Sequence, residues 1–340
     1  MSGNASSLSV MTVLTLIVAA AILSAGLIRL IRPWLTAYAL ARPNARSSHK
    51  VPTPQGAGIG IIAATLLVAG AALAIIPAIS LPALALLFAA TIGITVLGVA
   101  DDLKSVPVLP RLLGQGAAVG LALWIVPADF HVSPWLPLWV ERLALLFAGL
   151  WFVNLVNFMD GLDWLTVAET VPVTLALVVL GMLGNLPAAQ LVIAAALLGG
   201  MLGFAPFNRP VAKLFLGDGG SLPIGLLLGW CLLGLAQHGH YAAALLLPLY
   251  YLMDATLTLL RRLFGGEAIW TAHRSHFYQR ATSNGFSVIA VVGHVFALNI
   301  ALAALALASV WGGSAAFGVA MVAAGAALVG LVLRRFSSPR

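Results

Sequence analysis

Long apolar runs, separated by short polar stretches, repeat along the whole chain. Each run is close to the roughly 20 residues that an α-helix needs to cross the hydrocarbon core of a bilayer. The pattern therefore predicts an all-α, polytopic integral membrane protein with about 11 transmembrane helices. The runs lie at about 8–30, 57–77, 81–100, 111–127, 139–158, 165–183, 188–206, 219–236, 242–262, 286–309 and 314–333.

The stretches between the runs are short, and none is long enough to form a separate soluble domain. The longest lie at about 31–56 and 263–285, so residues 1–340 are interpreted as one membrane-embedded domain. The first run has no charged segment before it and is longer than a signal-peptide core, so it is predicted to be a retained span. Short connections within 57–100 and 165–206 leave the number of spans there open.

The basic residues indicate the orientation. With the N-terminus outside, 16 of the 17 lysines and arginines fall in inner loops or at inner helix ends, and only Arg142 lies near the outer side. Positive charge marks the cytoplasmic side of membrane proteins. The N-terminus is therefore predicted to be periplasmic and the C-terminus cytoplasmic.

Composition narrows the class further. The chain is 61% hydrophobic and 8% charged, which is far too apolar for a soluble protein of 340 residues. Its net charge of +7 comes from short clusters between the apolar runs, so nucleic acid is not expected as a partner. The single cysteine, Cys231, excludes an internal disulfide and a zinc site built from several cysteines.

Most of the aspartates lie at the cytoplasmic ends of the predicted spans. Asp101 and Asp102 end the third run, Asp160 and Asp163 follow the fifth, and Asp218 precedes the eighth. A carboxylate at the centre of an inserted helix costs roughly 2.5–3.5 kcal/mol, so acids near a membrane indicate function. Three spans that deliver carboxylates to one face predict a shared cation or phosphate site.

Two of these motifs have alternative interpretations. Asp101 and Asp102 point about 100° apart on a helix, so they contact different partners rather than chelate one ion alone; the alternative is a solvated helix end beside Lys104. Asn157 and Asp160 share a helix face and suit a base edge, a sugar hydroxyl or a metal-bound water. The alternative for this pair is an interfacial turn.

Three further polar segments are candidates for phosphate contacts. Asp218 precedes two glycines, which allow a phosphate to approach a helix N-terminus, although Asp218 also suits a plain N-cap. Lys50 in HKVPTPQGAG is either a topology signal or a phosphate contact. His273, Arg274 and His276 fit phosphate recognition better than a metal site.

Taken together, the blocks SSHKVPTPQGAG, GVADD, NFMDGLD, FLGDGGS and AHRSHFYQRA resemble the polyprenyl-phosphate N-acetylhexosamine-1-phosphate transferases. This family includes the phospho-N-acetylmuramoyl-pentapeptide transferase of peptidoglycan synthesis. The AHRSHFYQR form is similar to the branch that starts O-antigen or other surface polysaccharides, whereas the peptidoglycan branch has consecutive histidines there.

The resemblance implies transfer of a sugar-1-phosphate from a UDP-N-acetylhexosamine to undecaprenyl phosphate, with release of UMP. The sugar would be GlcNAc or a 6-deoxy relative. The reaction would take place at the cytoplasmic face of a bacterial inner membrane and would need Mg²⁺, with Mn²⁺ as the alternative ion. The resemblance is also compatible with a homodimer.

The resemblance also implies roles for individual residues. Asp218 would be the metal ligand, and the catalytic set would be Asp101, Asp102, Asp218, His273 and His276. Phe215 would stack on uracil within a substrate-binding set of Lys50, Thr53, Asn157, Asp160, Gly161, Leu162, Asp163, Asn208, Phe215 and Arg274. Two positions depart from the family pattern, since Trp164 and Ala57 stand where many members have glycine. Because Trp164 differs from the family pattern beside the sugar-binding residues, the identity of the donor sugar stays open.

The role of the acidic pair also stays open. The second pKa of a phosphate monoester lies near 6, so the lipid phosphate is largely a dianion and hardly needs a base. Metal organisation is therefore favoured over base catalysis, with a covalent aspartyl-phosphate as a further alternative. If so, the activity of an Asp102→Asn variant should recover little at high pH.

Outside these motifs, Asp254 is interpreted as a buried structural partner of Arg261, seven residues later. The rival to an enzyme is a cation-coupled membrane transporter of a phosphorylated or anionic substrate. A transporter predicts acids near the midplane and access from both faces. The acids here lie at one face, which favours an enzyme.

Overall fold

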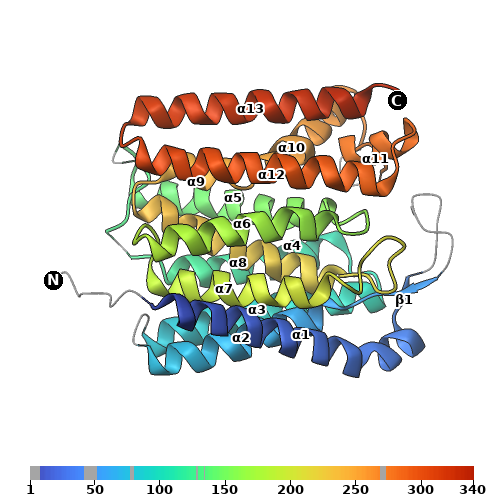
Figure 1. The fold of residues 1–340 in the computed structure, drawn as a ribbon, viewed down its shortest axis with the longest axis horizontal. Coiled ribbons are helices and arrows are strands. Elements are labelled where there is room, and N and C mark those ends of the chain that lie inside the picture. Colours follow the sequence, from blue (N-terminus) through green and yellow to red (C-terminus); the bar gives the residue numbers. More distant parts are fainter. Residues whose placement is uncertain (1–7, 42–51, 77–79, 128, 134, 269–272) are drawn as a thin grey trace.

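A computed structural model describes residues 8–41, 52–76, 80–127, 129–133, 135–268 and 273–340. These residues are almost entirely helical, and the long helices lie side by side in one bundle (Figure 1). The helices are α1 Val10–Tyr38, α2 Gly58–Ile75, α3 Leu81–Leu103, α4 Val108–Trp124, α5 Leu138–Phe158, α6 Leu165–Met182, α7 Ala188–Phe204, α8 Asp218–Gln237, α9 Tyr241–Leu246, α10 Leu249–Phe264, α11 Phe277–Ser283, α12 Val288–Trp311 and α13 Ala315–Ser337.

The helices confirm the predicted all-α membrane class. Eight of the described helices are long and apolar enough to cross a membrane, and the apolar helices α4 and α7 are shorter, at 17 residues each. The ninth apolar run is divided into α9 and α10 at Leu247–Pro248, because proline lacks the N–H group that a continuous helix needs. α1 begins and α13 ends at opposite ends of the bundle, as an odd number of crossings requires (Figure 1). The total of eleven spans stays a prediction.

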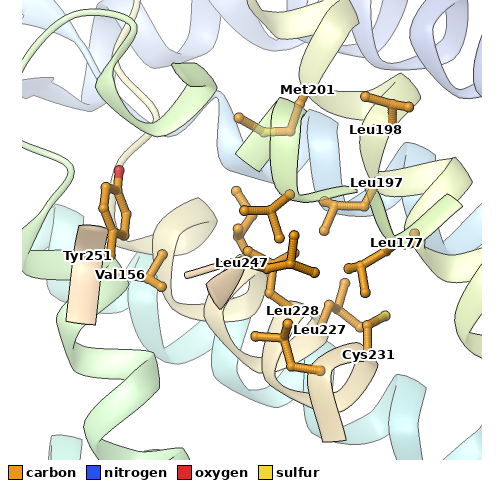
Figure 2. Packing of buried hydrophobic residues seen from close by; sticks show 14 of the residues in the cluster. Val156, Leu177, Leu197, Leu198, Met201, Leu227, Leu228, Cys231, Leu247 and Tyr251 are labelled. Atoms are coloured by element: carbon orange, nitrogen blue, oxygen red, sulfur yellow. The ribbon is translucent and has the colours of Figure 1, made fainter. Parts of the chain in front are cut away.

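The most buried helices of the bundle are α7, with fifteen of seventeen residues buried, and α8, with fifteen of twenty. Figure 2 shows Leu177 of α6, Leu197 of α7 and Leu227 of α8 meeting in this region. Large apolar side chains on the outer helices remain exposed, among them Ile75 at 84% and Trp124 at 82%. A bilayer would cover such side chains, so the core and the exposed faces both agree with a membrane-embedded bundle.

A small β-structure lies at the end of the bundle where α1 ends. β1, Leu40–Ala41, pairs antiparallel with β2, Thr53–Pro54, and Gln55 pairs in parallel with Phe215 just before α8. These contacts join the chain that precedes α2 to the chain that precedes α8. They fix the start of α8 at the same end of the bundle as the C-terminal ends of α3 and α5.

Candidate active site

The first turn of α8 is capped by a side chain from another helix. Asp102, in the last turn of α3, accepts the backbone N–H of Asp218 at 3.0 Å and that of Gly219 at 3.1 Å, one on each carboxylate oxygen. The first N–H groups of a helix lack partners within it, and an anion there is favoured by the helix dipole. Gly217 makes room for this contact, since its φ is +77° and a Cβ on it would lie 2.5 Å from Asp102 Oδ2. Asp102 therefore fixes the backbone of Asp218.

The side chain of Asp218 is held by α5. Asn157 Nδ2, in the last turn of α5, donates to Asp218 Oδ1 at 2.8 Å and to Ser221 Oγ at 2.9 Å. α3 approaches the same point closely, because a Cβ on Gly98 would lie only 2.3 Å from the Asp218 carbonyl oxygen. Three helices thus meet around one carboxylate, as the motifs predict.

Asp101 links this acidic cluster to α4. Its carboxylate accepts the Val106 N–H at 2.6 Å and Arg111 Nη1 at 2.8 Å, and it lies within hydrogen-bonding reach of the Asp218 carboxyl. The adjacent acids therefore have different partners, as their helical spacing predicts.

Asp160 lies in the loop between α5 and α6 and is half-buried. Thr166 Oγ1 donates to its Oδ1 at 2.5 Å. Burial raises the pKa of Asp160 to about 7; the Thr166 hydrogen bond opposes this shift, and the charges of Asp102 and Asp163 add to it. A carboxyl group that titrates near neutrality can accept a hydrogen bond from a sugar hydroxyl when ionised and donate one to it when protonated.

Asp163 and Asn208 connect two loops instead of pointing freely into a cavity. Asp163 Oδ2 accepts the Ala212 N–H at 2.9 Å. Asn208 Oδ1 accepts the Trp164 N–H at 2.7 Å, and its Nδ2 donates to the Leu214 carbonyl at 3.0 Å. Both side chains are buried, so they hold the segment 205–216 against the loop 159–164. A direct substrate contact by either residue stays a prediction.

The histidine segment is organised by Asp254 of α10, which is completely buried. Asp254 Oδ1 lies 3.2 Å from His276 Nδ1 and accepts the Phe277 N–H at 3.1 Å, while Oδ2 accepts the Tyr278 N–H at 3.2 Å. The rings of His273 and His276 lie 4.9 Å apart. Asp254 therefore caps α11 and orients His276.

A cavity of about 790 Å³ lies between α4, α5, α10 and the histidine segment. Apolar side chains of these helices, including Trp151 and Leu259, form much of its wall. Its polar lining residues are Arg111, Asn154, Asn157, His273, His276 and Gln279. Asn157 belongs to both this cavity and the acidic cluster, so the two halves of the candidate site are continuous.

The remaining predicted residues lie around this centre. Thr53 is buried in β2, Leu162 lies in the apolar core, and Phe215 is half-buried, with its N–H donating to the Pro54 carbonyl at 2.8 Å. Arg274 is exposed and lies 3.4 Å from Thr282 Oγ1. Their substrate contacts stay predictions.

Gly161 is exposed and lies directly under α11. A Cβ on it would come within 2.0 Å of the Tyr278 hydroxyl oxygen, and that hydroxyl donates to the Phe158 carbonyl at 3.0 Å. Glycine is therefore required for α11 to pack on the loop 159–164. Lys50, the other predicted residue, lies outside the described residues.

Sequence reasoning missed two residues of the site. Arg111 was assigned only to topology, although it contacts Asp101 and lines the cavity. Asp254 was interpreted as a partner of Arg261, but it accepts hydrogen bonds from the histidine segment and from Tyr250 and Thr258 of its own helix. Arg261 lies 5.2 Å from the centre of the Phe277 ring. The only sequence signal for Asp254 was an acid within an apolar run.

The acidic cluster contains carboxylate oxygens that suit a divalent cation. Mg²⁺ takes one or two carboxylates and completes its shell with waters and substrate phosphates. Both oxygens of Asp102 accept N–H groups of α8, and those of Asp101 accept N–H groups of Val106 and Arg111. Asp218 lies beside the Asp101 carboxyl, and a cation stabilises two carboxyls held close together. Among the described residues, no three His, Cys, Asp or Glu side chains form a complete metal site of their own. A cation bound here would need further ligands from a substrate or water, and Mg²⁺ or Mn²⁺ at this place stays a prediction.

The site brings acids, cationic side chains and a cavity together within a helical bundle of the membrane-spanning class. The pattern of glycosyl transferase family 4 matches residues 84–236, from α3 to the end of α8. This matched part of the chain belongs to glycosyl transferase family 4.

Several relatives span much of the chain. The decaprenyl-phosphate N-acetylglucosaminephosphotransferase of Mycolicibacterium smegmatis is 29% identical over 289 residues, which cover 73% of this chain and 70% of the relative. A probable undecaprenyl-phosphate N-acetylglucosaminyl 1-phosphate transferase of Bacillus subtilis is 29% identical over 252 residues, 66% and 67% of the two chains. The phospho-N-acetylmuramoyl-pentapeptide-transferase of Desulforamulus reducens is 36% identical over 163 residues, 42% and 48% of the two chains. The predicted family is confirmed.

Proposed function

We propose that this protein transfers an N-acetylhexosamine-1-phosphate from a UDP-sugar to undecaprenyl phosphate and releases UMP. The enzyme class follows from the family match and from the relatives, which are named as sugar-phosphate transferases acting on a polyprenyl phosphate. They support a glycosyl-1-phosphate transferase. The proposal adds the UDP-linked donor, the cytoplasmic face of the inner membrane, and a product that starts O-antigen or a related surface glycan.

The observation that supports the proposal most strongly is the position of Asn157. This side chain holds Asp218 in the acidic cluster and also lines the cavity of about 790 Å³ beside Arg111 and the two histidines. A reaction between two phosphate groups needs such a place, where anions are neutralised and aligned. A second, apolar cavity of about 420 Å³ shares Trp151 with the first and offers room for an isoprenoid chain.

In the reaction, a phosphate oxygen of the lipid attacks the phosphorus that carries the sugar. A new P–O–P bond forms, and the bond between that phosphorus and the oxygen of the UMP phosphate breaks. The lipid phosphate is largely a dianion at neutral pH, so no proton has to be removed from it. Both oxygens of Asp102 accept N–H groups of α8, which suits a positioning residue better than a general base.

The side chains around the cavity have distinct tasks in this scheme. Arg111 offers a fixed positive charge where the two phosphates meet. His276, held by Asp254, can donate a hydrogen bond to a phosphate oxygen. Asp218, with Asp101 beside it, would hold Mg²⁺ or Mn²⁺. A divalent cation there would neutralise charge on the donor phosphates and on the departing UMP.

The test uses purified protein in lipid nanodiscs with undecaprenyl phosphate and a panel of UDP-N-acetylhexosamines. We expect UMP release that requires the lipid and Mg²⁺, is abolished by chelation, and is lost in an Asp218→Asn variant. A Leu81→Ala variant, at an exposed position at the start of α3, is the matched control and should keep its activity. Failure of every UDP-sugar to yield UMP, together with uptake of an anion into vesicles, would support the transporter instead.

A further inference from the structure

Trp164 has an unusual backbone conformation. It is the one residue other than glycine with a positive φ in the described part of the chain, at +62° with ψ near 0°. In this left-handed region the Cβ of an L-residue crowds the following carbonyl, which costs roughly 1–2 kcal/mol. Such a conformation persists only where the surroundings hold it. Glycine adopts it freely, so a tryptophan here calls for a compensating contact.

The compensating contacts all lead to one segment of the chain. The backbone N–H of Trp164 donates to Asn208 Oδ1 at 2.7 Å, and its indole N–H donates to the Ala205 carbonyl at 2.6 Å. Both acceptors lie in the segment 205–216, which follows α7. The indole bond requires tryptophan, since phenylalanine has the bulk without the donor and glycine has neither.

The other end of the segment is fixed independently. The Phe215 N–H donates to the Pro54 carbonyl at 2.8 Å, and the Gly58 N–H donates to the Leu216 carbonyl at 3.0 Å. Asp163 holds the middle through the Ala212 N–H at 2.9 Å. The segment then passes directly into Gly217 and the first turn of α8. Trp164 is thus its anchor at the end near α7.

We propose that Trp164 is a positioning residue: its two N–H groups hold the segment 205–216 against the loop 159–164, and this contact sets how tightly the donor is bound. The kinetic part of the proposal rests on the proposed function. Asp160 lies in the loop and Phe215 lies in the segment, so the contact fixes the spacing between the predicted sugar and base contacts. The apolar cavity of about 420 Å³, offered above for the isoprenoid chain of the acceptor, is lined by no residue of this loop or this segment.

The first test separates binding of the two substrates. Trp164→Phe keeps the ring and removes the indole N–H, and Trp124→Phe, at an 82% exposed position of α4, is the matched control. One neutral hydrogen bond corresponds to roughly a two- to tenfold change in an equilibrium constant. We therefore expect Trp164→Phe to raise the donor KM about two- to tenfold, with kcat and the acceptor KM unchanged. Asn208→Ala should change the same parameter in the same direction.

The second test does not depend on activity. Hydrogen–deuterium exchange of peptides covering 205–216 should be faster in Trp164→Phe and faster still in Trp164→Gly, with α8 unchanged beyond its first turn. The thermal midpoint of Trp164→Gly should fall by less than the loss of the packed ring and its hydrogen bond alone would cause, because relief of the backbone strain offsets part of that loss.

The two tests fail in different ways. Unchanged exchange in 205–216 for both variants overturns the proposal. Equal changes in donor KM, acceptor KM and kcat together with a lower midpoint also overturn it, because they indicate general destabilisation. A wild-type protein that is inactive with every donor overturns the proposed function, while the exchange data still decide whether Trp164 holds the segment.

Discussion

The contact between Asp102 and α8 leads to a prediction about the sign of a stability change. Asp102→Asn keeps the shape of the side chain but can accept only one of the two N–H groups, and its amide N–H₂ then faces the other. Losing one hydrogen bond to a charged acceptor costs about 1.5–3 kcal/mol, and losing an anion at a helix N-terminus costs about 0.3–1 kcal/mol. We therefore expect a loss of about 2–4 kcal/mol, and a larger loss in Asp102→Ala.

If Asp102 served only in catalysis, Asp102→Asn would be expected to stabilise the protein instead of destabilising it. Asp102 carries charge close to Asp101, Asp160 and Asp218. Without a capping role, neutralising it relieves repulsion and raises the thermal midpoint. The capping role predicts a midpoint that decreases from wild type to Asp102→Asn to Asp102→Ala, with UMP release decreasing in the same order.

The assay is thermal unfolding of the purified protein in one detergent at fixed pH, alongside kcat and KM across pH. Asp160→Asn serves as the control for removal of a negative charge without removal of a helix cap. An Asp102→Asn protein that is at least as stable as the wild type and has lost all activity would refute the capping argument. Strong recovery of its activity at high pH would point to a general base instead.

Three further predictions concern the surrounding residues. Because the pKa of Asp160 is raised to about 7, the folded protein binds more protons than the unfolded chain between about pH 4 and 7, and the stability of the wild type should fall as pH rises through this window. The thermal midpoint of Asp160→Asn minus that of the wild type should therefore grow from pH 5 to 8. A difference that stays constant would contradict the raised pKa. Asp254→Ala should cost about 3–5 kcal/mol by leaving buried donors, including the His276 ring, without their acceptor, seen as a lower midpoint and lost UMP release; an active, equally stable variant would contradict it. Gly161→Ala should cost about 1–3 kcal/mol by displacing Tyr278, and adding Tyr278→Phe should recover part of the midpoint and activity; the prediction fails if Gly161→Ala alone behaves as wild type.

The helices could be predicted from the sequence because their signal is local. An apolar run at about 286–309 became α12 at Val288–Trp311, and the acids fell at the expected end of the bundle. The division of the ninth run at Leu247–Pro248 was missed, because hydropathy averages over a window and does not register a lost backbone donor. The proline itself was the available signal.

The contacts within the site depend on long-range packing, which spacing along the chain does not contain. Asp102 caps a helix that begins 116 residues later, and Asn157 reaches Asp218 over 61 residues. Motifs indicated that these residues matter, but their division into capping, orienting and ligand roles required the fold. Asp254 shows the same limit, since its partners in the histidine segment lie 22 to 24 residues away and it helps to define the conformation of that segment.

The central claim, transfer of the sugar together with one phosphate, is tested most directly by following that phosphate. Purified protein receives undecaprenyl phosphate and UDP-GlcNAc labelled with ³²P at the phosphate next to the sugar, or the UDP-sugar that the panel identifies. The account predicts that the label moves into the organic phase with the lipid and that unlabelled UMP is released in equal amount. Label that stays in the aqueous phase as UDP, with the sugar alone on the lipid, would contradict it.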